Sequence, residues 1–240
     1  MTTPRFVTAA DQVRVVAYPH VTVVLKGNTG ALNALTGDTS RIWAALASTG
    51  DTQTPVQGVE PSAVGRSVGS LIKHGLLVPT TIPRPWLPPR AGRASRPSWG
   101  THDSPAALPP IPKAALRWYA PALIAILIVL VIRDSGPQRL RFARLRAVST
   151  QATLRRRVLD PVTATSIVRA VRRTGRLIPA RVACLEESAA VMLILGLLGY
   201  GADWKHGVAV DPVRLHAWVE VDGQPIEEAA DIVDYTPFEE

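Results

Sequence analysis

The chain has 240 residues and a hydrophobic fraction of 47%, which is enough for a sizeable core in one large domain or two small ones. Its single cysteine excludes an internal disulfide, and we find no secretory signal pattern at the N-terminus, so we expect a cytoplasmic protein. The formal net charge is +8, with many arginines between Arg133 and Arg181. An acidic peptide, an anionic membrane face or a polyanion would each suit such a charge as a partner.

The first eighty residues predict a small sheet backed by helices. Short β-branched or apolar runs cover 13–18, 21–26 and 31–36, and turn-forming residues separate them, which is typical of a three-stranded meander. Asp38 is expected to cap the first helix. A second helix is predicted from about Ser62, with Val64, Val68, Leu71 and Ile72 at helical spacing.

Proline punctuates the middle of the chain. Ten prolines lie between Pro79 and Pro112, with arginine and serine among them. Such a segment cannot hold a helix or an interior strand, so we expect a stiff, solvated linker over 81–112. This linker would divide the chain into domains at 1–80 and 113–240.

The first domain resembles the PqqD-like fold, which serves as a recognition element for precursor peptides. The resemblance covers about residues 10–80 and rests on ALNALTG at 31–37, RIW at 41–43 and GLL at 75–77. The short segment 54–61 implies a reduced middle helix. In that family a leader peptide adds a strand to the third β-strand and packs on the last helix. The resemblance thus implies leader contacts at Ala31, Leu32, Asn33, Ala34, Leu35, Val64, Val68 and Ile72.

An uncharged, strongly apolar segment covers 118–132. Its fifteen residues fall short of the ~20 that cross a bilayer. We therefore favour a buried core helix over membrane contact. The arginine-rich stretch 139–157 predicts an amphipathic helix, and its basic face leaves peripheral membrane association open.

The only cysteine, Cys184, lies in the first turn of a helix predicted over 183–198. The apolar residues of this helix that we expect to face the core of the domain are Leu185, Ala189, Met192, Leu193 and Leu197. The positive end of a helix dipole favours a thiolate and would lower the pKa of Cys184. The plain structural interpretation is a small buried apolar residue, as most lone cysteines are.

Two strands are predicted at 204–210 and 215–221. Alternation in the second places His216, Trp218 and Glu220 on one face and aliphatic residues on the other. A histidine there can act as the base for the thiol.

The hairpin after the second strand decides which acid lies beside His216. A three-residue loop ending in Gly223 sets Glu228 directly across from it, whereas a two-residue loop leaves Glu227 diagonal on the same face. We favour Glu228, with Glu227 in reserve, as the third member of a Cys-His-acid triad. Asp222 is interpreted as a turn former.

Other features carry less chemistry. His206 is an alternative base, although its position at a strand end favours a structural role. We find no metal-ligand spacing and no nucleotide-binding glycine loop, so neither a metal nor another cofactor is expected. The basic residues lack interleaved aromatics, and nucleic-acid binding ranks last.

Residues 112–235 resemble the transglutaminase-like leader peptidases of lasso peptide biosynthesis, the B proteins. The resemblance rests on Cys184-Leu185 with Ser188 and Ala190, on Gly207-Val208, and on HAWVE at 216–220 with Gly223. It implies that Cys184 is the nucleophile and His216 the base. The family's acid is an aspartate twelve residues after the histidine, and Glu228 stands at that position, longer by one methylene.

The two resemblances together match the fused form of that family. They imply an α+β chain in which a small PqqD-like, winged-helix-type domain precedes a transglutaminase-like, papain-like cysteine peptidase domain. The implied activity is cleavage of a ribosomal precursor between leader and core, before macrolactam closure by a separate ATP-dependent, asparagine-synthetase-like cyclase. The alternatives are an acyl transferase and a non-catalytic scaffold that recruits the precursor for the cyclase.

Overall fold

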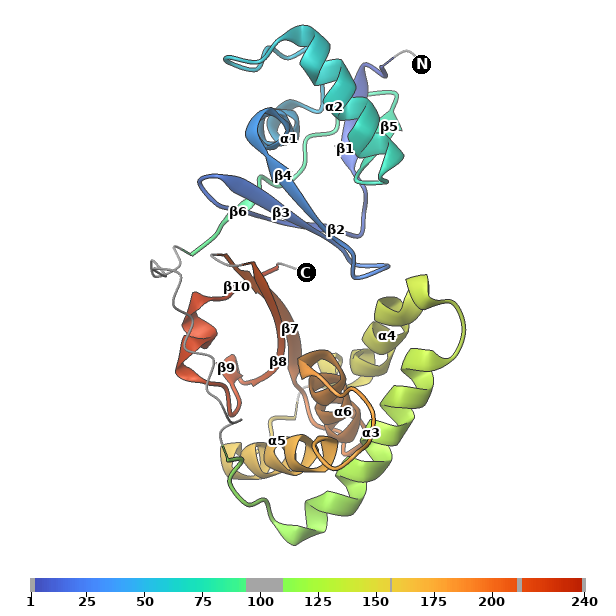
Figure 1. Cartoon of the computed structure of the whole chain (residues 1–240), viewed down its shortest axis with the longest axis vertical. Coiled ribbons are helices and arrows are strands. Elements are labelled where there is room, and N and C mark those ends of the chain that lie inside the picture. The colour runs from blue at the N-terminus through green and yellow to red at the C-terminus, as the bar shows by residue number, and fades with distance from the viewer. Residues whose placement is uncertain (1–2, 94–109, 156, 211–212, 239–240) are drawn as a thin grey trace. The chain divides into compact units, whose positions relative to one another are not determined.

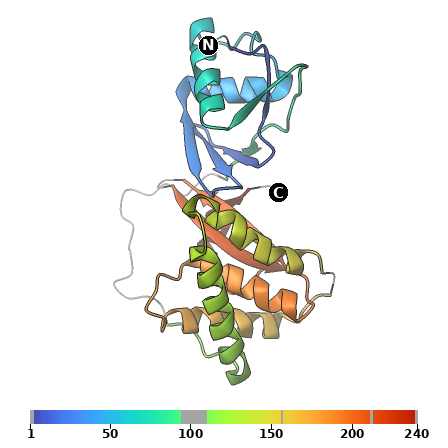
Figure 2. The ribbon, with the colours of Figure 1, turned by 90° about the vertical axis from the view of Figure 1, so that its right-hand side faces the viewer.

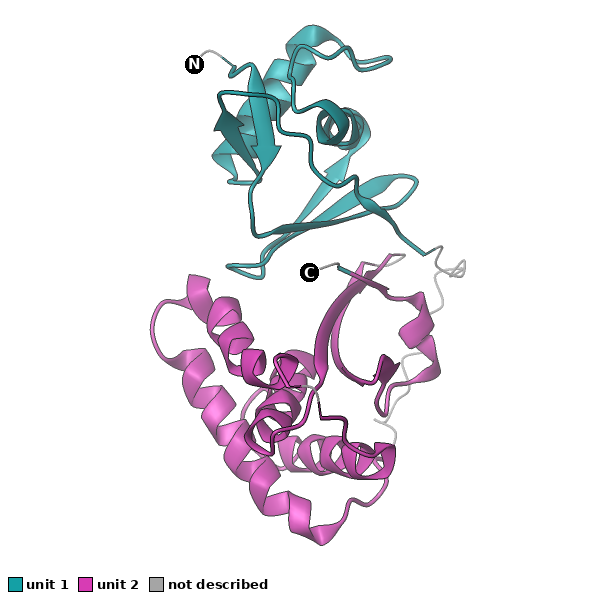
Figure 3. Ribbon diagram, turned by 180° about the vertical axis from the view of Figure 1, so that it is seen from behind, with its two compact units in different colours: residues 1–94, 238–240 teal, residues 95–237 magenta. Residues whose placement is uncertain are grey.

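The chain forms two compact α+β units (Figure 3). The computed structural model describes residues 3–93, 110–155, 157–210 and 213–238. The first unit comprises residues 1–94 with 238–240, and the second comprises 95–237. The sequence-based expectation of a mixed α+β chain is confirmed.

The first unit is built around the predicted meander. Strands β2 (Val13–Ala17), β3 (Val21–Lys26) and β4 (Leu32–Thr36) pair antiparallel in the order β4-β3-β2 (Figure 1). Two strands that we did not predict, β1 (Phe6–Ala9) and β5 (Leu77–Thr80), form a separate antiparallel pair. Among the described strands β4 ends the four-stranded sheet.

Two helices complete this unit, α1 (Gly37–Thr49) and α2 (Pro61–Lys73). The residue that caps α1 is Thr36 rather than the predicted Asp38, which lies in the first turn and forms a 2.5 Å ion pair with Arg41. Residues 54–60 form turns rather than a helix. The core of the unit is lined by both helices and by four strands, β1, β3, β4 and β5, and its fully buried members include Val7, Val24, Ile42, Trp43 and Val68.

The predicted linker begins later than residue 81. Trp86 packs edge-on against Trp43 with ring centroids 5.6 Å apart, and the short strand β6 (Arg90–Ala91) pairs parallel with β2. Residues 82–91 therefore belong to the first unit, because an aromatic anchor and a sheet edge hold them despite their prolines. Residues 94–109 of the predicted linker lie outside the described part of the chain.

The second unit is a helical layer packed against a sheet. Its helices are α3 (Tyr119–Asp134), α4 (Arg141–Thr153), α5 (Pro161–Gly175) and α6 (Cys184–Leu197), with single 3₁₀ turns at Leu116–Trp118, Gln138–Leu140 and Ala230–Asp234. Helix α6 is apolar on nearly all sides and lies at the centre, in contact with α3, α4, α5 and β8. The predicted core residue Leu197 is an exception, since it is 77% exposed at the end of the helix.

The prediction that 118–132 is a buried core helix is only half right. One side of α3, with Ala122, Ile126 and Val129, is fully buried, whereas Ile124 and Val131 are 58% and 68% exposed. Together with the preceding turn, the helix runs from Leu116 to Asp134, with a mean hydropathy of 1.9 over its most apolar 18-residue window, 28% of which is buried. By length and composition alone it could cross a membrane.

The sheet of this unit follows the helices in the sequence. Strands β7 (Asp203–Ala209) and β8 (Arg214–Val221) form a long antiparallel pair, with β9 (Gln224–Pro225) beside β8 and β10 (Thr236–Pro237) beside β7. The predicted alternation in β8 is confirmed on its aliphatic side, because Ala217, Val219 and Val221 are buried. This arrangement sets one end of α6 beside β8, where the candidate site lies.

Candidate active site

Cys184 is the first residue of α6, and its neighbours fix that helix start. The side chain of Glu186 accepts a 3.1 Å hydrogen bond from the amide of Ala183, which satisfies one donor that the helix leaves without a backbone partner. Arg133, at the end of α3, approaches Glu186 at 3.4 Å and donates to the carbonyl of Arg181 at 2.7 Å. The loop before the cysteine is therefore tied to α3.

A second set of contacts holds the first turn of α6 from inside the unit. The hydroxyl of Ser188 donates to the carbonyl oxygen of Cys184 at 2.5 Å, and the indole Nε1 of Trp204 donates to that hydroxyl at 2.7 Å. Trp204 comes from β7 and is buried. These hydrogen bonds join the first turn of α6, which carries the thiol, to strand β7.

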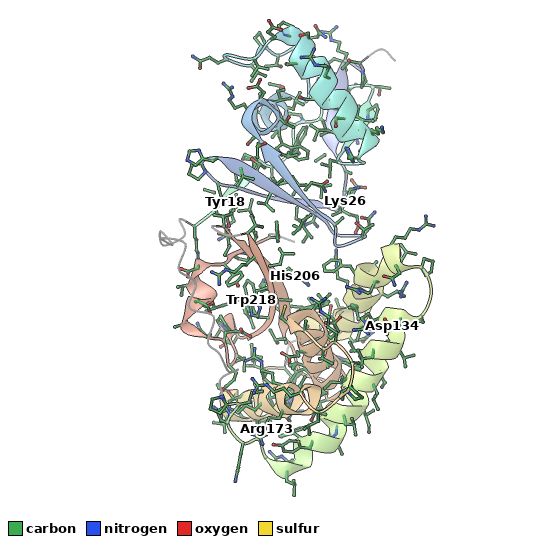
Figure 4. All side chains as sticks on the ribbon, in the orientation of Figure 1. Tyr18, Lys26, Asp134, Arg173, His206 and Trp218 are labelled. Carbon is green, nitrogen blue, oxygen red and sulfur yellow. The ribbon has the colours of Figure 1, made fainter. Side chains whose placement is uncertain are left out.

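His216 lies on β8 between two aromatic rings. Trp218 stacks beside it with centroids 5.9 Å apart, and Tyr235 lies at 5.3 Å. Figure 4 labels Trp218 on this strand. The residue paired with His216 on β7 is Gly207, and a Cβ atom there would lie 2.7 Å from the Trp218 ring. Only glycine leaves room for Trp218 at this point.

The imidazole of His216 joins the thiol to an acid. Its Nε2 lies 2.7 Å from Oε2 of Glu228, and the ring also hydrogen-bonds the side chain of Cys184. Because Nε2 is occupied by the acid, Nδ1 is the nitrogen that remains for sulfur. The backbone amide of Ala217 donates to the same sulfur. The three residues proposed from the sequence as a triad are therefore in contact.

Glu228 is the acidic residue in contact with His216, but the three-residue loop that we expected in the hairpin is wrong. Val221 pairs with Gln224, so the turn has two residues, Asp222 and Gly223, both with positive φ. On that register an uninterrupted strand would bring Glu227 toward His216.

Glu227 itself breaks the strand. Its φ is +58°, a left-handed conformation that costs a residue other than glycine about 1–3 kcal/mol. The chain turns there, so the next side chain, that of Glu228, reaches His216. The carboxylate of Glu227 instead pairs with Arg169 at 2.9 Å.

The pKa values of the pair are displaced in opposite directions. Burial is the largest single influence and opposes the charged forms of both Cys184 and His216, but their hydrogen bonds and charge interactions together outweigh it. The amide of Ala217 and the imidazolium lower the pKa of the Cys184 thiol. The contacts with Cys184 and Glu228 raise the pKa of His216 to about 9. The site therefore stabilises the pair of a thiolate and an imidazolium relative to the neutral pair.

Our sequence reasoning missed the charged residues behind the triad. Arg172 of α5 contacts Glu228 at 2.6 Å and Glu187 of α6 at 3.7 Å. Burial raises the pKa of the Glu187 carboxyl, while Arg172 and Arg176 act against that rise. Arg172, Glu187 and Glu228 border a cavity of about 20 Å³ next to Cys184. The sequence does predict the start of α5, because Asp160-Pro161 is typical of a helix N-terminus. In the structure the Asp160 carboxylate accepts a hydrogen bond from the amide of Thr163 at 2.8 Å.

The alternative base lies elsewhere on the sheet. His206 packs against the rings of Phe142 and Trp204, with centroids 5.1 and 4.5 Å away. Burial and the nearby Arg146 lower its pKa to about 4. His206 is therefore neutral at physiological pH and held by aromatic contacts.

The predicted leader-binding residues are only partly accessible. Ala34 on β4 and Ala31 directly before it are exposed, and Leu32 and Asn33 are half-buried. Ile72 on α2 is also half-buried. Leu35, Val64 and Val68 belong to the buried core of the first unit, and contact of these three side chains with a leader stays a prediction. The apolar spacing of Val64 and Val68 on α2 reflects packing of that helix against α1 and β5.

Residues 127–240 match the family model described as transglutaminase-like superfamily. This part of the chain is a transglutaminase-like domain. Such a domain is consistent with cysteine peptidase or acyltransferase activity. No curated protein and no solved structure shows significant similarity to the chain.

The reactivity of the thiol should reveal the pair. The lowered pKa of Cys184 enlarges the thiolate fraction at neutral pH, so its alkylation by iodoacetamide should have a pH midpoint below that of an ordinary thiol. In His216→Ala the thiol should return toward its ordinary pKa, and alkylation at pH 7 should slow by about tenfold. Intact-mass spectrometry over a pH series measures both rates. Equal rates for the two proteins at pH 7 would contradict the pairing.

Proposed function

We propose that this protein is a leader peptidase of lasso peptide maturation, in which the first unit binds the precursor's leader and the transglutaminase-like domain cleaves it from the core. The observation that carries the catalytic part is the contact of Cys184 with His216 and of His216 with Glu228. The resemblances at 10–80 and 112–235 supply the substrate class.

The site supports the following chemistry. The Cys184 thiolate attacks the scissile carbonyl, and the His216 imidazolium gives its proton to the leaving amine of the core. The leader then forms an acyl-thioester on sulfur. Neutral His216 takes a proton from water, which hydrolyses the thioester and releases the leader as a carboxylic acid. Glu228 orients the ring and stabilises its charged form, and the amide of Cys184 is our candidate oxyanion donor.

The first unit would supply the leader by tethering. A peptide bound to one part of a chain reaches a thiol in another part at an effective concentration far above its bulk value. Strand β4 offers the means, because its outer edge has no neighbour among the described strands. The bond from Lys26 N–H to the carbonyl of Ala31 sets the alternation, so Leu32 and Ala34 point their amides away from β3.

Ala34 provides a test of this edge. Ala34→Pro removes an outward amide and leaves the hydrogen bonds to β3 in place, so leader affinity should fall by roughly tenfold with little change in melting temperature. Ala34→Thr keeps the amide and should bind like the parent. Fluorescence anisotropy of a labelled leader peptide, taken from a candidate precursor gene beside this one, measures the effect. Unchanged affinity in Ala34→Pro would remove β4 from the proposal.

The proposal includes a separate partner enzyme. Cleavage frees the amino terminus of the core, which an ATP-dependent, asparagine-synthetase-like cyclase would then join to a carboxyl side chain. We propose that both enzymes act in the cytoplasm, where the precursor is made.

Product identity distinguishes hydrolysis from the two alternatives. In H₂¹⁸O, hydrolysis of the candidate precursor adds one ¹⁸O to the released leader carboxylate, and mass spectrometry detects this. Acyl transfer would release a leader joined to an amine and free of the label. A precursor that binds but stays intact, both alone and with cyclase and ATP, would favour the recruiting scaffold.

A further inference from the structure

We propose that Arg172 is a positioning residue that holds Glu228 against His216. This inference rests on the proposed catalytic role of Cys184 and His216, and it adds a residue that neither the sequence motifs nor the family match singles out. Arg172 lies on α5, and its side chain reaches the segment after β9.

One guanidinium contacts two consecutive residues of that segment. Its Nη2 donates to Oε1 of Glu228 at 2.6 Å, and its Nη1 donates to the carbonyl oxygen of Glu227. The planar fork of an arginine fixes both directions at once, which a lysine cannot do. Arg169, one turn earlier on α5, holds the Glu227 carboxylate.

These contacts hold a residue whose backbone conformation is energetically unfavourable. Glu227 has a φ of +58°, and this turn is what directs Glu228 to the histidine. The carbonyl that Arg172 binds belongs to the same residue. Without the guanidinium, Glu227 would be free to return to an extended conformation, and Glu228 would leave His216.

The two oxygens of Glu228 have different partners. Oε1 faces Arg172 and Oε2 faces Nε2 of His216 at 2.7 Å. The arginine therefore sets the rotation of the carboxylate, and the side chain is only 8% exposed, so water competes little for it. The titratable and charged groups that face this cluster are Arg169 and Arg172 from α5, Arg176 directly after it, Cys184 and Glu187 from α6, His216 from β8, and Glu227, Glu228 and Tyr235 from the last part of the chain.

Alkylation of Cys184 tests this role without any peptide substrate. If Arg172 holds Glu228 on His216, its loss lowers the pKa of His216 and weakens the thiolate. In Arg172→Gln, the pH profile of alkylation should move toward alkaline pH by about one unit, and reaction with iodoacetamide at pH 6.5 should be several-fold slower. A profile equal to that of the parent would overturn the proposal.

The matched control is Arg173→Gln, which removes the same charge from the next position of α5. Arg173 binds the carbonyl of Ile111 at 2.7 Å, and Figure 4 labels it on α5. It should keep the parental profile, and an equal shift in both variants would overturn the proposal in favour of a general charge effect.

A double-mutant cycle separates positioning from simple structural support. Arg172→Gln should have little further effect in a Glu228→Gln background, because its action passes through that carboxylate. Fully additive effects would overturn the proposal. If Arg172→Gln does not fold by circular dichroism, Arg172→Lys replaces it and should alkylate more slowly than the parent at pH 6.5, and an equal rate would overturn the proposal. Normal alkylation with no leader release would instead count against the proposed function alone.

A separate observation concerns the outer side of α3, and from it we infer that this helix lies on an anionic lipid surface. Figure 2 looks onto α3, the long green helix at the outside of the unit. Its exposed apolar stripe, here called the α3 stripe, consists of Leu123, Ile124, Leu127, Ile128 and Val131. A continuous stripe of this kind on a soluble surface marks an interaction site.

The charges around the α3 stripe favour an anionic lipid surface as its binding partner. No charged residue interrupts 118–132, whereas exposed cations stand at both ends, namely Lys113 and Arg117 before the helix and Arg139 and Arg141 after it. The opposite side of α3 belongs to the core around α6, so the helix can lie along a bilayer surface without leaving that core.

Vesicle flotation of the full chain tests this contact independently of any peptidase activity. The protein should float with vesicles of equal phosphatidylcholine and phosphatidylglycerol, and less with phosphatidylcholine alone. Val131→Glu should reduce binding by at least about tenfold. Leu177→Glu, at a residue that is 82% exposed outside the stripe, should bind like the parent.

Two outcomes would overturn the lipid assignment. One is the absence of flotation at any lipid composition. The other is a dimer by light scattering that Val131→Glu converts to a monomer, because a second copy of the chain would then cover the α3 stripe.

Discussion

Replacing Cys184 with alanine is expected to abolish leader release from the precursor, with a fall in rate of roughly 10⁴-fold or more. The substitution removes the only sulfur nucleophile in the chain and leaves the His216–Glu228 contact in place. Because the leader would be bound by the first unit, its affinity should stay unchanged. Mass spectrometry of the precursor measures release, and anisotropy measures binding.

The alanine variant has a useful companion in Cys184→Ser. A serine hydroxyl has a far higher pKa than a thiol, so the imidazolium that pairs with a thiolate cannot activate it equally. We expect it to be nearly as inactive as alanine. Parental release by either variant would show that cleavage does not pass through residue 184.

Replacing His216 with alanine should have an effect of similar size. The thiol loses the contact that lowers its pKa, and the leaving amine loses its proton donor, so both halves of the reaction suffer. Leader release should fall by roughly 10³-fold or more at pH 7. Single-turnover assays over a pH series measure this, and the parent should lose activity above pH 9 as His216 deprotonates.

His206 provides the matched control for that variant. It is the other histidine of the sheet, but its contacts are the rings of Phe142 and Trp204. His206→Gln should retain release within a few-fold of the parent, although it can lower stability. A large loss of release in a folded His206→Gln, with normal release in His216→Ala, would reverse the two roles.

Part of the candidate site could be predicted from local sequence patterns. The helix start at Cys184 and the alternation of β8 follow from patterns within a few residues, and the structure brings the two elements together at the thiol. The acid depends on the conformation of a single residue. Glu227 adopts a positive φ that its type does not favour, and arginines more than fifty residues away in the sequence hold it there. Turn preferences for a hairpin cannot predict this conformation of Glu227, because it depends on residues far away in the sequence.

Elsewhere in the fold, too, local sequence patterns predict some elements and miss contacts between distant segments. The meander β2-β3-β4 follows from turn chemistry, whereas the pairing of β1 with β5 joins segments seventy residues apart and has no local signal. The prolines after Pro79 predict a linker, but Trp86 anchors part of it to Trp43. Helix α3 appears in the sequence as uniformly apolar, so only its packing against α6 distinguishes a buried side from an exposed one.

The most direct test of the central claim is to alkylate the protein and follow activity at the same time. Cys184 is the only cysteine in the sequence, so iodoacetamide can add one group to sulfur, and intact mass gives the modified fraction at each time point. We predict that leader release is lost in proportion to that fraction, with a single rate constant for both. Protein that is fully alkylated at Cys184 and still releases leader at the parental rate would contradict the account.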